Sequence, residues 1–463
     1  MILSNNSLKY IGAIALLLAA AACTKFVDVP LPINQIPNAA AFADDGKAQS
    51  SMRGIYAATQ NGFGNGPFSG GLTTLLGLSS DEFTKATYSA DEQLFFDNNL
   101  SASTGPVSSA IWAPMYASLY MINNLYENVE KSKGVSAKIK DELMGEAKFL
   151  RALHNFYLVN LYDSLPLAVS SNYQVNALLP RTAPEKAWEL INSDLTFAIE
   201  KMNTAYTERG YRYRANRYAA YALMARTQLY QQNWIKAEEN ASNVINAGPY
   251  RLENLDSTFN IRSREAILQL ANAGTNLYAL EAGKTTGGGA VATYRLSSYT
   301  KDAFEPNDLR WTKWVKIGTD GFAGHGKYKV FSNTNPLLTA EATNILRLGE
   351  QYLIRAEARA MQDNLTGAIA DVDSIRARAG LPLISNTNPG ISKENLLLAI
   401  EKERQTELFG ELGHRWLDVK RRGLADVIFG ARKPKWRKEA ALFPIPFYDR
   451  QNNPYLGQNP GYE

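Results

Sequence analysis

Three glutamates near the carboxyl end of the chain have a spacing that could bring their carboxylates together. Glu403, Glu407 and Glu411 follow one another at intervals of four residues, so a helix would place all three on one face. Two neighbouring carboxylates can hydrolyse a glycosidic bond, one as the acid and the other as the base or nucleophile. The three residues therefore raise two hypotheses, a glycan-cleaving enzyme and a structural cluster.

Neighbouring cations favour the structural hypothesis. Carboxylates stacked at this spacing repel one another and destabilise a helix unless positive charges lie between them. Arg404 lies three residues before Glu407, and Arg415 lies four residues after Glu411. We predict that these side chains, together with Asp418, form a structural ion network that fixes the last long helix to the rest of the fold.

A second candidate site rests on aromatic residues in two stretches without helical periodicity, about 61–110 and 256–345. Sugar rings present apolar faces and a rim of hydroxyl groups, so a sugar site needs flat aromatic side chains with polar groups beside them. A single aromatic residue belongs to a protein core more often than to such a platform. We predict the following ligand-binding residues: Tyr88, Tyr278, Tyr294, Tyr299 and Trp311 as aromatic platforms, and Asn65, Asp81 and Arg295 as polar partners.

Motifs for other chemistries are incomplete. Gly283-Lys284-Thr285 resembles the end of a phosphate-binding loop, but Tyr278 stands where that loop needs a glycine. The chain has one cysteine and three histidines, which are too few for a zinc finger or a Cys-rich metal centre. We therefore predict a protein that is not an enzyme and has no cofactor and no metal site.

The amino terminus has the features of an export signal. Residues 1–22 contain one cation, Lys9, and end in the apolar run from Ile11 to Ala22. This run is well short of the roughly 20 residues that span a bilayer. The single cysteine, Cys23, follows three alanines, as in a bacterial lipobox, and is predicted to carry a lipid rather than a free thiol. The lipid would hold the protein on a membrane, and the Pro-rich residues 23–38 would form an extended tether.

The composition is that of an ordinary globular protein. Of the 463 residues, 45% are hydrophobic and 20% are charged, which excludes a disordered chain. The net charge of +4 gives no overall field that would attract nucleic acid. Five cations gather between Arg432 and Lys438, but an exported protein does not meet nucleic acid. We predict that this run is a solvated loop and that the protein binds no nucleic acid.

Amphipathic helices must position these residues. Apolar side chains recur every three or four positions, which is the period of a helix with one buried face. The segments with this pattern are about 45–60, 112–131, 142–162, 185–203, 215–247, 348–379 and 392–411. Gln232-Asn233 and Asp363-Asn364 interrupt two of the segments, so each of these two is predicted to be a pair of helices.

The two helix pairs are also related by sequence. Ala225 and Ala237 of the first pair correspond to Ala356 and Ala368 of the second, with a shared offset of 131 residues. Small residues at fixed positions are typical of a tetratricopeptide repeat (TPR), because its two helices cross closely. A chance likeness between two amphipathic hairpins is the alternative. We predict TPR-like repeats with functional loops inserted between them.

Longer motifs resemble the SusD/RagB family, and the resemblance covers nearly the whole chain. The matching stretches are Glu146 to Leu153, Leu165-Pro166-Leu167, Tyr352 to Leu381, Glu403 to Arg421, Phe443-Pro444-Ile445-Pro446 and Asn459-Pro460-Gly461-Tyr462. The resemblance implies a mainly α, SusD-like fold in one domain over residues 39–463. In it, about four TPR-like helix-turn-helix pairs carry a loop-rich, partly irregular face with insertions near 61–110 and 256–345.

The resemblance also implies a place and a function. Proteins of this kind are lipid-anchored at the cell surface, on the outer membrane of Bacteroidota. They bind oligosaccharide nutrients and deliver them to a SusC-like TonB-dependent transporter, and they are not catalysts. Three alternatives stay open: a member of the same family that binds peptides, a TPR scaffold without a small ligand, and a glycan-cleaving enzyme.

Overall fold

The computed structural model describes residues 38–61, 66–247, 249–272, 278–285, 291–331 and 340–462. The predicted signal over residues 1–22, the predicted lipidation site Cys23, nearly all of the predicted tether and Asn65 lie outside these residues. Within the part of the chain that the structure describes, no helix is long and apolar enough to cross a membrane.

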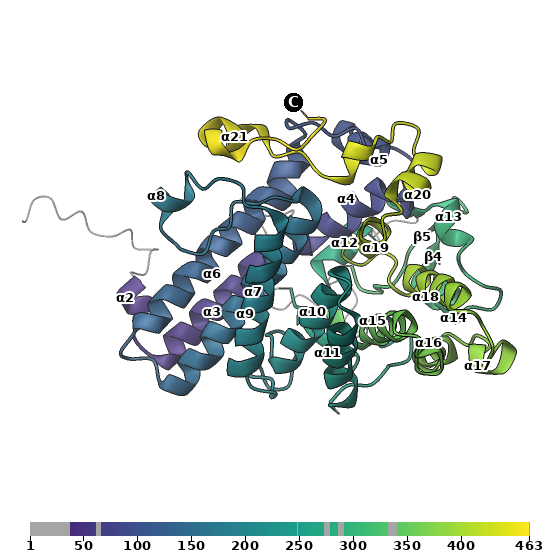
Figure 1. The fold of residues 1–463 in the computed structure, drawn as a ribbon, viewed down its shortest axis with the longest axis horizontal. Helices are drawn as coiled ribbons and strands as arrows, with labels where there is room; N and C mark the ends of the chain where they lie inside the picture. Colours follow the sequence, from purple (N-terminus) through teal and green to yellow (C-terminus); the bar gives the residue numbers. More distant parts are fainter. Residues whose placement is uncertain are drawn as a thin grey trace, which may run out of the picture.

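The fold is built mainly from helices that pack in pairs (Figure 1). Helix α3 packs on α6, α7 on α9, α10 on α11, and α15 on α16. The bounds of these helices are α3 (Asp45–Asn61), α6 (Ala113–Lys131), α7 (Ala137–Tyr162), α9 (Pro184–Lys201), α10 (Arg217–Tyr230), α11 (Trp234–Asn246), α15 (Leu348–Met361) and α16 (Leu365–Arg378). In Figure 1 the row turns from α6, which lies along the page, to α15 and α16, which are seen nearly end-on. The predicted TPR-like helical fold is confirmed.

The two predicted helix breaks have the same local structure. Gln232 and Asp363 adopt left-handed backbone angles, with φ of 58° and 63°. Each is followed by an asparagine whose side chain accepts a hydrogen bond from the backbone N–H three residues further on. Asn233 and Asn364 therefore act as the amino-terminal caps of α11 and α16.

The small residues that relate these two pairs lie at close helix crossings. Ala225, Ala237, Ala356 and Ala368 are fully buried, and α10 packs on α11 as α15 packs on α16. Larger side chains at these positions would push the helices apart, because a close-packed interior has no room for further methylene groups. The close helix crossings therefore explain why small residues recur at these positions in the two helix pairs.

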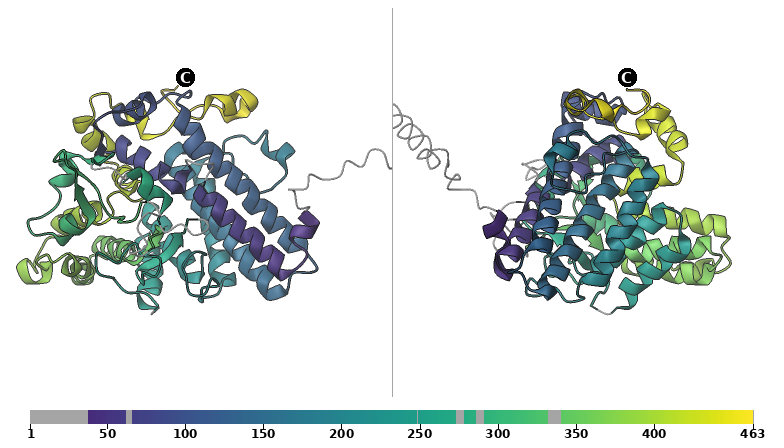
Figure 2. Two further views of the ribbon diagram at one scale, coloured as in Figure 1. Left: turned by 180° about the vertical axis from the view of Figure 1, so that it is seen from behind. Right: turned by 60° about the vertical axis from the view of Figure 1, so that its left-hand side comes forward.

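The remaining helices connect the repeats or pack around them. They are α2 (Asn38–Ala41), α4 (Gly71–Ser79), α5 (Ala90–Asp97), α8 (Tyr173–Asn176), α12 (Leu280–Thr285), α13 (Ser298–Lys301), α14 (Leu309–Trp314), α17 (Ile384–Thr387), α18 (Lys393–Glu407), α19 (His414–Arg421), α20 (Ala425–Arg432) and α21 (Phe447–Asn452). Single turns complete the set: η3 (Pro67–Ser69), the π-helical η4 (Val107–Trp112), η5 (Lys438–Ala441) and η6 (Pro454–Leu456). Figures 1 and 2 show the carboxy-terminal helices beside the amino-terminal α4 and α5, and α19 packs on α4.

The expectation that 61–110 and 256–345 contain no helix was wrong. Helices α4 and α5 form in the first segment, and α12, α13 and α14 form in the second. Every residue of α4 is buried, so this helix has no polar face and no amphipathic period for the sequence to display. The other four have at most eight residues, which is too short for a periodicity analysis to detect.

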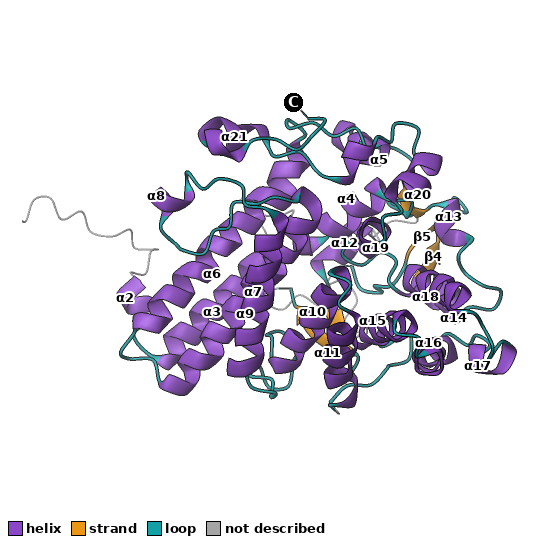
Figure 3. Cartoon of the chain, in the orientation of Figure 1, coloured by secondary structure: helices purple, strands orange, loops and turns teal. Residues whose placement is uncertain are grey.

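Two small antiparallel sheets join the loop-rich segments (Figure 3). One has the strand order β1 (Phe83–Thr84), β3 (Arg295–Leu296), β5 (Ala323–His325) and β4 (Val315–Ile317). In the other, β2 (Ala266–Leu270) pairs with β6 (Thr343–Arg347), and every residue of both strands is buried. The first sheet places Thr84 opposite Arg295, so it brings the two predicted loop insertions together.

Helix α18 attaches the carboxy-terminal part of the chain to the repeats. Its residues Leu396 and Ile400 pack with Ala356 and Ala368 in a small apolar cluster. One and two turns further along the same helix, the buried face continues with glutamates instead of apolar residues. This change from apolar to charged contacts creates the ion network described below.

The fold predicts different costs for two glycine substitutions. Gly413 and Gly423 both have left-handed backbone angles, with φ of 74° and 69°. A methyl group on Gly413 would lie 2.3 Å from Leu76 of α4, whereas one on Gly423 would meet no described atom within 4 Å. We expect Gly423→Ala to lower the free energy of unfolding by about 1–2 kcal/mol, the cost of a left-handed non-glycine residue. Gly413→Ala should lose about 1–3 kcal/mol more through overpacking. Urea denaturation measures both values, and equal losses would contradict the close contact between α19 and α4.

Candidate functional site

Glu403, Glu407 and Glu411 are buried and surrounded by cations from other elements. The ion pairs are Glu403 with Arg310 (2.9 Å) and Arg376 (2.7 Å), Glu407 with Arg347 (2.6 Å), Arg310 (3.3 Å) and Arg378, and Glu411 with Arg347 (2.7 Å) and Lys327. Arg310 belongs to α14, Arg347 to β6, Arg376 and Arg378 to α16, and Lys327 follows β5. The network therefore joins α18 to a repeat helix, to both sheets and to the loop-rich segment.

The cations keep Glu407 and Glu411 charged. Burial would raise the pKa of Glu411, but Arg347 and Lys327 lower that pKa to about 2. Burial also opposes the charge on Glu407, and three arginines hold its pKa well below the usual range of a carboxyl group. A carboxyl group that stays ionised to such a low pH has no proton to give as a general acid near neutral pH. Among the described residues, no group of three or more His, Cys, Asp or Glu side chains is arranged to hold a metal ion.

Arg404 and Arg415 bind aspartates rather than the glutamates that the helical spacing indicated. The Nε of Arg404 donates a hydrogen bond to Asp418 at 2.8 Å. Arg415 makes two hydrogen bonds to the carboxylate of Asp81, at 2.8 and 2.9 Å. A spacing rule compares residues of one helix, whereas a guanidinium on its long stem also reaches the neighbouring elements.

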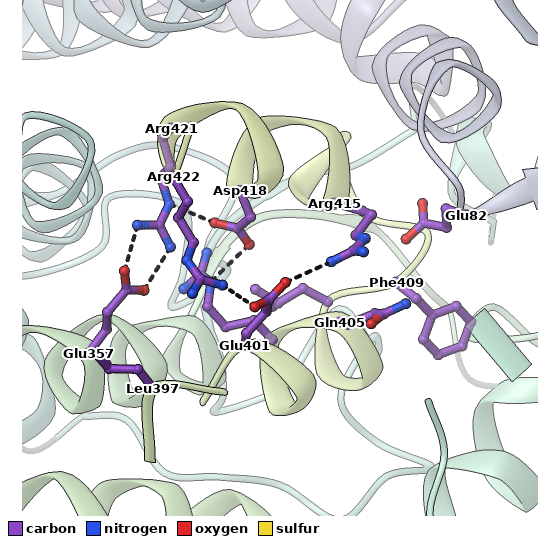
Figure 4. Close-up of a pocket in the computed structure, with 12 residues that line it drawn as sticks. Glu82, Glu357, Leu397, Glu401, Gln405, Phe409, Arg415, Asp418, Arg421 and Arg422 are labelled. Atoms are coloured by element: carbon purple, nitrogen blue, oxygen red, sulfur yellow. Dashed lines mark hydrogen bonds and ion pairs between the residues drawn. The ribbon is translucent and has the colours of Figure 1, made fainter. Parts of the chain in front are cut away.

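A small cavity lies beside the network, between α18 and α19 (Figure 4). Arg421 binds both carboxylate oxygens of Glu357 at 2.7 Å on one side of it, and Glu401 pairs with Arg415 at 3.4 Å on the other. Both Nη atoms of Arg404 border the cavity without a hydrogen-bond partner among the described residues. The space of about 20 Å³ suits one water molecule, which needs about 10–15 Å³, and is too small for a sugar ring.

A second cluster of ion pairs, formed by Asp81, Arg415 and Arg432, reaches the surface at Tyr299. Asp81, which binds Arg415, also pairs with Arg432. The guanidinium carbon of Arg432 lies 4.2 Å from the centre of the Tyr299 ring, and Gln405 of α18 donates a hydrogen bond to the Tyr299 carbonyl at 3.3 Å. Tyr299 is nevertheless 42% exposed. The structure thus brings two of the predicted residues, Asp81 and Tyr299, together through an arginine.

Two other predicted residues lie side by side at the start of β3 but have different surroundings. Tyr294 is buried, and its hydroxyl donates a hydrogen bond to Glu92 at 2.7 Å. Arg295 pairs with Asp320 at 2.5 Å and lies 3.8 Å from the centre of the Phe322 ring. Phe322 is 51% exposed, and nothing in its sequence context distinguishes it from the other aromatics of the segment. Phe322 becomes a candidate only in the structure, where the sheet pairing brings it next to Arg295.

Trp311 borders an open hollow of about 620 Å³. Its ring packs edge-on against Phe304, with 5.4 Å between the ring centres. The hollow is lined by the segment from Lys301 to Thr312, which carries amide, hydroxyl and carboxylate groups. Its volume is within the range of about 300–1,000 Å³ that is typical of ligand sites.

Tyr88 and Tyr278 are half-buried. Tyr88 packs against Phe96, with 4.9 Å between the ring centres, and its hydroxyl accepts a hydrogen bond from the backbone N–H of Lys85 at 3.0 Å. Tyr278 lies just before α12. For both residues, contact with a ligand stays a prediction.

The cations between Arg432 and Lys438 differ in their surroundings, and only Lys433 of them is buried. Lys433 is buried and donates a hydrogen bond to a carbonyl of α4 at 2.7 Å, and Lys435 pairs with Asp97 of α5 at 2.7 Å. The prediction of a solvated loop was therefore wrong for Lys433. The run ties the carboxy-terminal segment to the amino-terminal helices, a long-range role that local charge density does not reveal.

Known protein families account for most of the chain. The sequence model of the SusD family matches residues 200–462, which is more than half of the protein. The chain belongs to the SusD/RagB family. A second family model, described as starch-binding and associating with the outer membrane, matches residues 80–229.

Individual relatives of this SusD-family protein are distant in sequence and similar in fold. SusD-like protein P25 from Formosa agariphila is 24% identical over 411 residues, which are 75% of this chain and 78% of the relative. A SusD superfamily structure from Bacteroides vulgatus has a TM-score of 0.78 at 18% identity, and covers 91% of this chain and 100% of its own. A laminarin-binding SusD-like protein and surface glycan-binding protein A from Bacteroides fluxus both have TM-scores of 0.74, at 22% and 23% identity, with the same coverage. At these identities the likeness shows a shared fold.

The ion network makes the stability of this SusD-family protein dependent on pH. The pKa of Glu411 is about 2 in the folded protein, against a usual value of 4.5. A carboxyl group with a lowered folded pKa stabilises the protein above its unfolded pKa, and this contribution is lost as the pH falls from about 4.5 to about 2. Glu411→Gln should remove this part of the acid destabilisation. It should also lower the free energy of unfolding at pH 7 by about 3–5 kcal/mol, because Lys327 and Arg347 then lack a counter-charge.

Denaturant titrations at several pH values measure this effect. Glu189→Gln, which removes one partner of an exposed ion pair, is the matched control and should change stability by less than about 1 kcal/mol. If Glu411→Gln does not fold, the double variant Glu411→Gln/Lys327→Met, which removes both charges, should recover part of the loss. An acid profile of Glu411→Gln parallel to that of the unchanged protein would contradict the role given to Glu411.

Proposed function

We propose that this SusD-family protein is a lipid-anchored lipoprotein at the surface of the outer membrane. It binds oligosaccharides and delivers them to a SusC-like TonB-dependent transporter. The observation that carries the proposal is the Tyr299 ring, which reaches solvent while Arg432 and Gln405 hold it in place. Two similar structures have names that state glycan or laminarin binding, and this supports a carbohydrate as the ligand class.

Tyr299 suits the apolar face of a sugar ring. An aromatic ring gives a sugar a flat apolar partner, and the stacking gains little if the ring must first be ordered. Here the ordering is complete before binding, because α13 begins with a capping hydrogen bond from Thr300 N–H to Ser297 Oγ at 3.2 Å. The buried carboxylate of Asp81 fixes the arginine under the ring. Asp81 thus supports the site indirectly, by holding the arginine that lies against the Tyr299 ring.

Trp311 and Phe322 extend the proposed binding face. The hollow beside Trp311 is also lined by Lys301 of α13, so it adjoins the helix that carries Tyr299. Phe322 adds an exposed ring on the four-stranded sheet, backed by Arg295. We propose Tyr299 and Trp311 as platforms, and Arg295 as the residue that positions Phe322.

The charges of this face favour a neutral ligand. Arg295 pairs with Asp320, and Arg432 pairs with Asp81, so each arginine already has a carboxylate partner within the protein. Aromatic rings and neutral polar groups are then the means of recognition, as oligosaccharides require. A peptide ligand is the second candidate within the family, and a scaffold without a small ligand is the third.

We propose that the protein binds and does not cleave its ligand. The buried glutamates are held as carboxylates by cations, and the adjoining cavity is too small for a sugar ring. The lipid on Cys23 would keep the binding domain beside its transporter, as the export signal and lipobox in the sequence indicate.

Tyr299→Ala should weaken saccharide binding at least about tenfold, which corresponds to about 1.4 kcal/mol. An array of neutral oligosaccharides, including fragments of laminarin, together with peptides would identify the ligand, and calorimetry would then compare the variants. Ile235→Ala is the control, because Ile235 is 69% exposed on α11, among the repeats. Binding of peptides alone would contradict the carbohydrate proposal. Co-purification with a TonB-dependent barrel without any bound ligand would favour the scaffold.

A further inference from the structure

A stripe of aromatic residues follows one face of α6, away from the proposed binding face. Trp112, Tyr116 and Tyr120 are spaced by four residues, so they follow one another along that face, about one helical turn apart. The rings of Trp112 and Tyr116 are 4.7 Å apart between centres. Tyr120 is 49% exposed. Figure 1 places α6 and α8 at the opposite side of the molecule from α13, which carries Tyr299.

Two other segments turn this stripe into a groove of about 450 Å³. One wall is α8, with Tyr173 and Asn176, and the other is the end of the chain, with Asp449 and Asn452 of α21. Tyr173 is 73% exposed. The groove therefore has an aromatic floor, an aromatic ring and an amide group at the α8 wall, and amide and carboxylate groups at the α21 wall.

Hydrogen bonds fix the walls to the floor. Tyr116 donates from its hydroxyl to the carbonyl of Pro166 at 3.1 Å, and Ser170 and Ser171 both donate to the carboxylate of Glu127 on α6. On the other wall, the side-chain amide of Asn453 donates to the carbonyl of Leu179 at 2.9 Å. The groove is thus formed before any ligand binds, which lowers the entropic cost of binding.

We propose that this groove is a second saccharide site, separate from the face that carries Tyr299. The inference takes its ligand class from the proposed function and adds a second place of binding. The rings of Tyr120 and Tyr173 offer exposed apolar faces to sugar rings, whereas Trp112 is buried beside them. The carboxylate of Asp449 and the amides of Asn176 and Asn452 offer hydrogen bonds to the sugar hydroxyl groups. The volume is in the range of small-ligand sites, which is about 300–1,000 Å³.

The charge of the groove also fits a neutral, hydroxyl-rich ligand. Among the described residues that line it, Asp449 is the single charged one. Burial raises the pKa of Asp449, and a hydrogen bond from the side chain of Trp112 opposes that rise. A carboxylate in partly apolar surroundings gains from hydroxyl donors, because each of them replaces lost water. A flat protein interface would not need this concave arrangement of polar groups.

The test compares the two sites in the same protein. The double variant Tyr120→Ala/Tyr173→Ala removes two exposed rings of the groove, and Tyr448→Ala is the matched control, because Tyr448 is 73% exposed on α21 and does not line the groove. The probes are glucose, galactose, mannose and laminarin fragments. Saturation-transfer NMR and crystal soaking detect their binding. Each probe is measured on the unchanged protein, on Tyr299→Ala and on the groove variant.

We expect Tyr299→Ala to retain saccharide binding in the groove, and the added groove substitutions to weaken that residual binding at least about tenfold, with no change for Tyr448→Ala.

The proposal is overturned if no probe binds the Tyr299→Ala protein, or if the groove variant binds as well as its parent. It is also overturned if the groove variant loses a co-purifying barrel and keeps its saccharides, since the groove is then a protein interface. If Tyr299→Ala alone abolishes binding, the proposed function stands and the second site fails. If no probe binds the unchanged protein, both fail.

Discussion

The structure depends on neutralising the carboxylates that α18 and the loop after it bury. A buried charge without a partner costs several kcal/mol, and Glu403, Glu407 and Glu411 are all buried. Their cations come from α14, α16, β6 and the residue Lys327. These elements must therefore assemble around α18 together. The network thus joins the repeats to the loop-rich segments, and we expect it to favour this one arrangement of them.

A second cluster of buried ion pairs extends to the surface. Arg415 follows the glutamates in the sequence and binds Asp81, and Asp81 in turn pairs with the arginine that lies against the Tyr299 ring. An exposed aromatic ring that is held in this way can bind a sugar without first losing its own freedom of motion. The groove on α6 is also rigid before a ligand binds. There, hydrogen bonds between backbone carbonyls and side chains fix the walls. Rigid support of aromatic rings is common to both places.

The sequence predicted the features that depend on local periodicity. The repeat helices have the helical period, and their breaks at Gln232 and Asp363 coincide with left-handed turns. Helix α4 was not predictable in this way, since it is buried on every side and has no period. Family motifs predicted the overall architecture where the periodicity of single helices could not.

The sites were predictable only in part. Tyr299 and Trp311 were chosen as aromatics in long loops, and both lie where a ligand could reach them. Asp81 was chosen as a polar partner of the ligand, but its carboxylate is bound by Arg415, which is 334 residues away in the sequence. No spacing rule connects residues so far apart. The groove on α6 shows the same limit, because its aromatic stripe is visible in the sequence while its walls come from distant segments.

The most direct test of the central claim is hydrogen exchange in Asp81→Asn, compared with the unchanged protein and with the surface control Glu189→Gln. The account predicts faster exchange in two regions together: the backbone amides of α13, including Lys301, whose N–H bonds to Ser297 at 3.0 Å, and the amides of α19 around Arg415. Glu189→Gln should exchange like the unchanged protein in both regions. Unchanged protection of α13 in Asp81→Asn would show that the buried ion pairs of Asp81 do not hold the binding face, and would contradict the account.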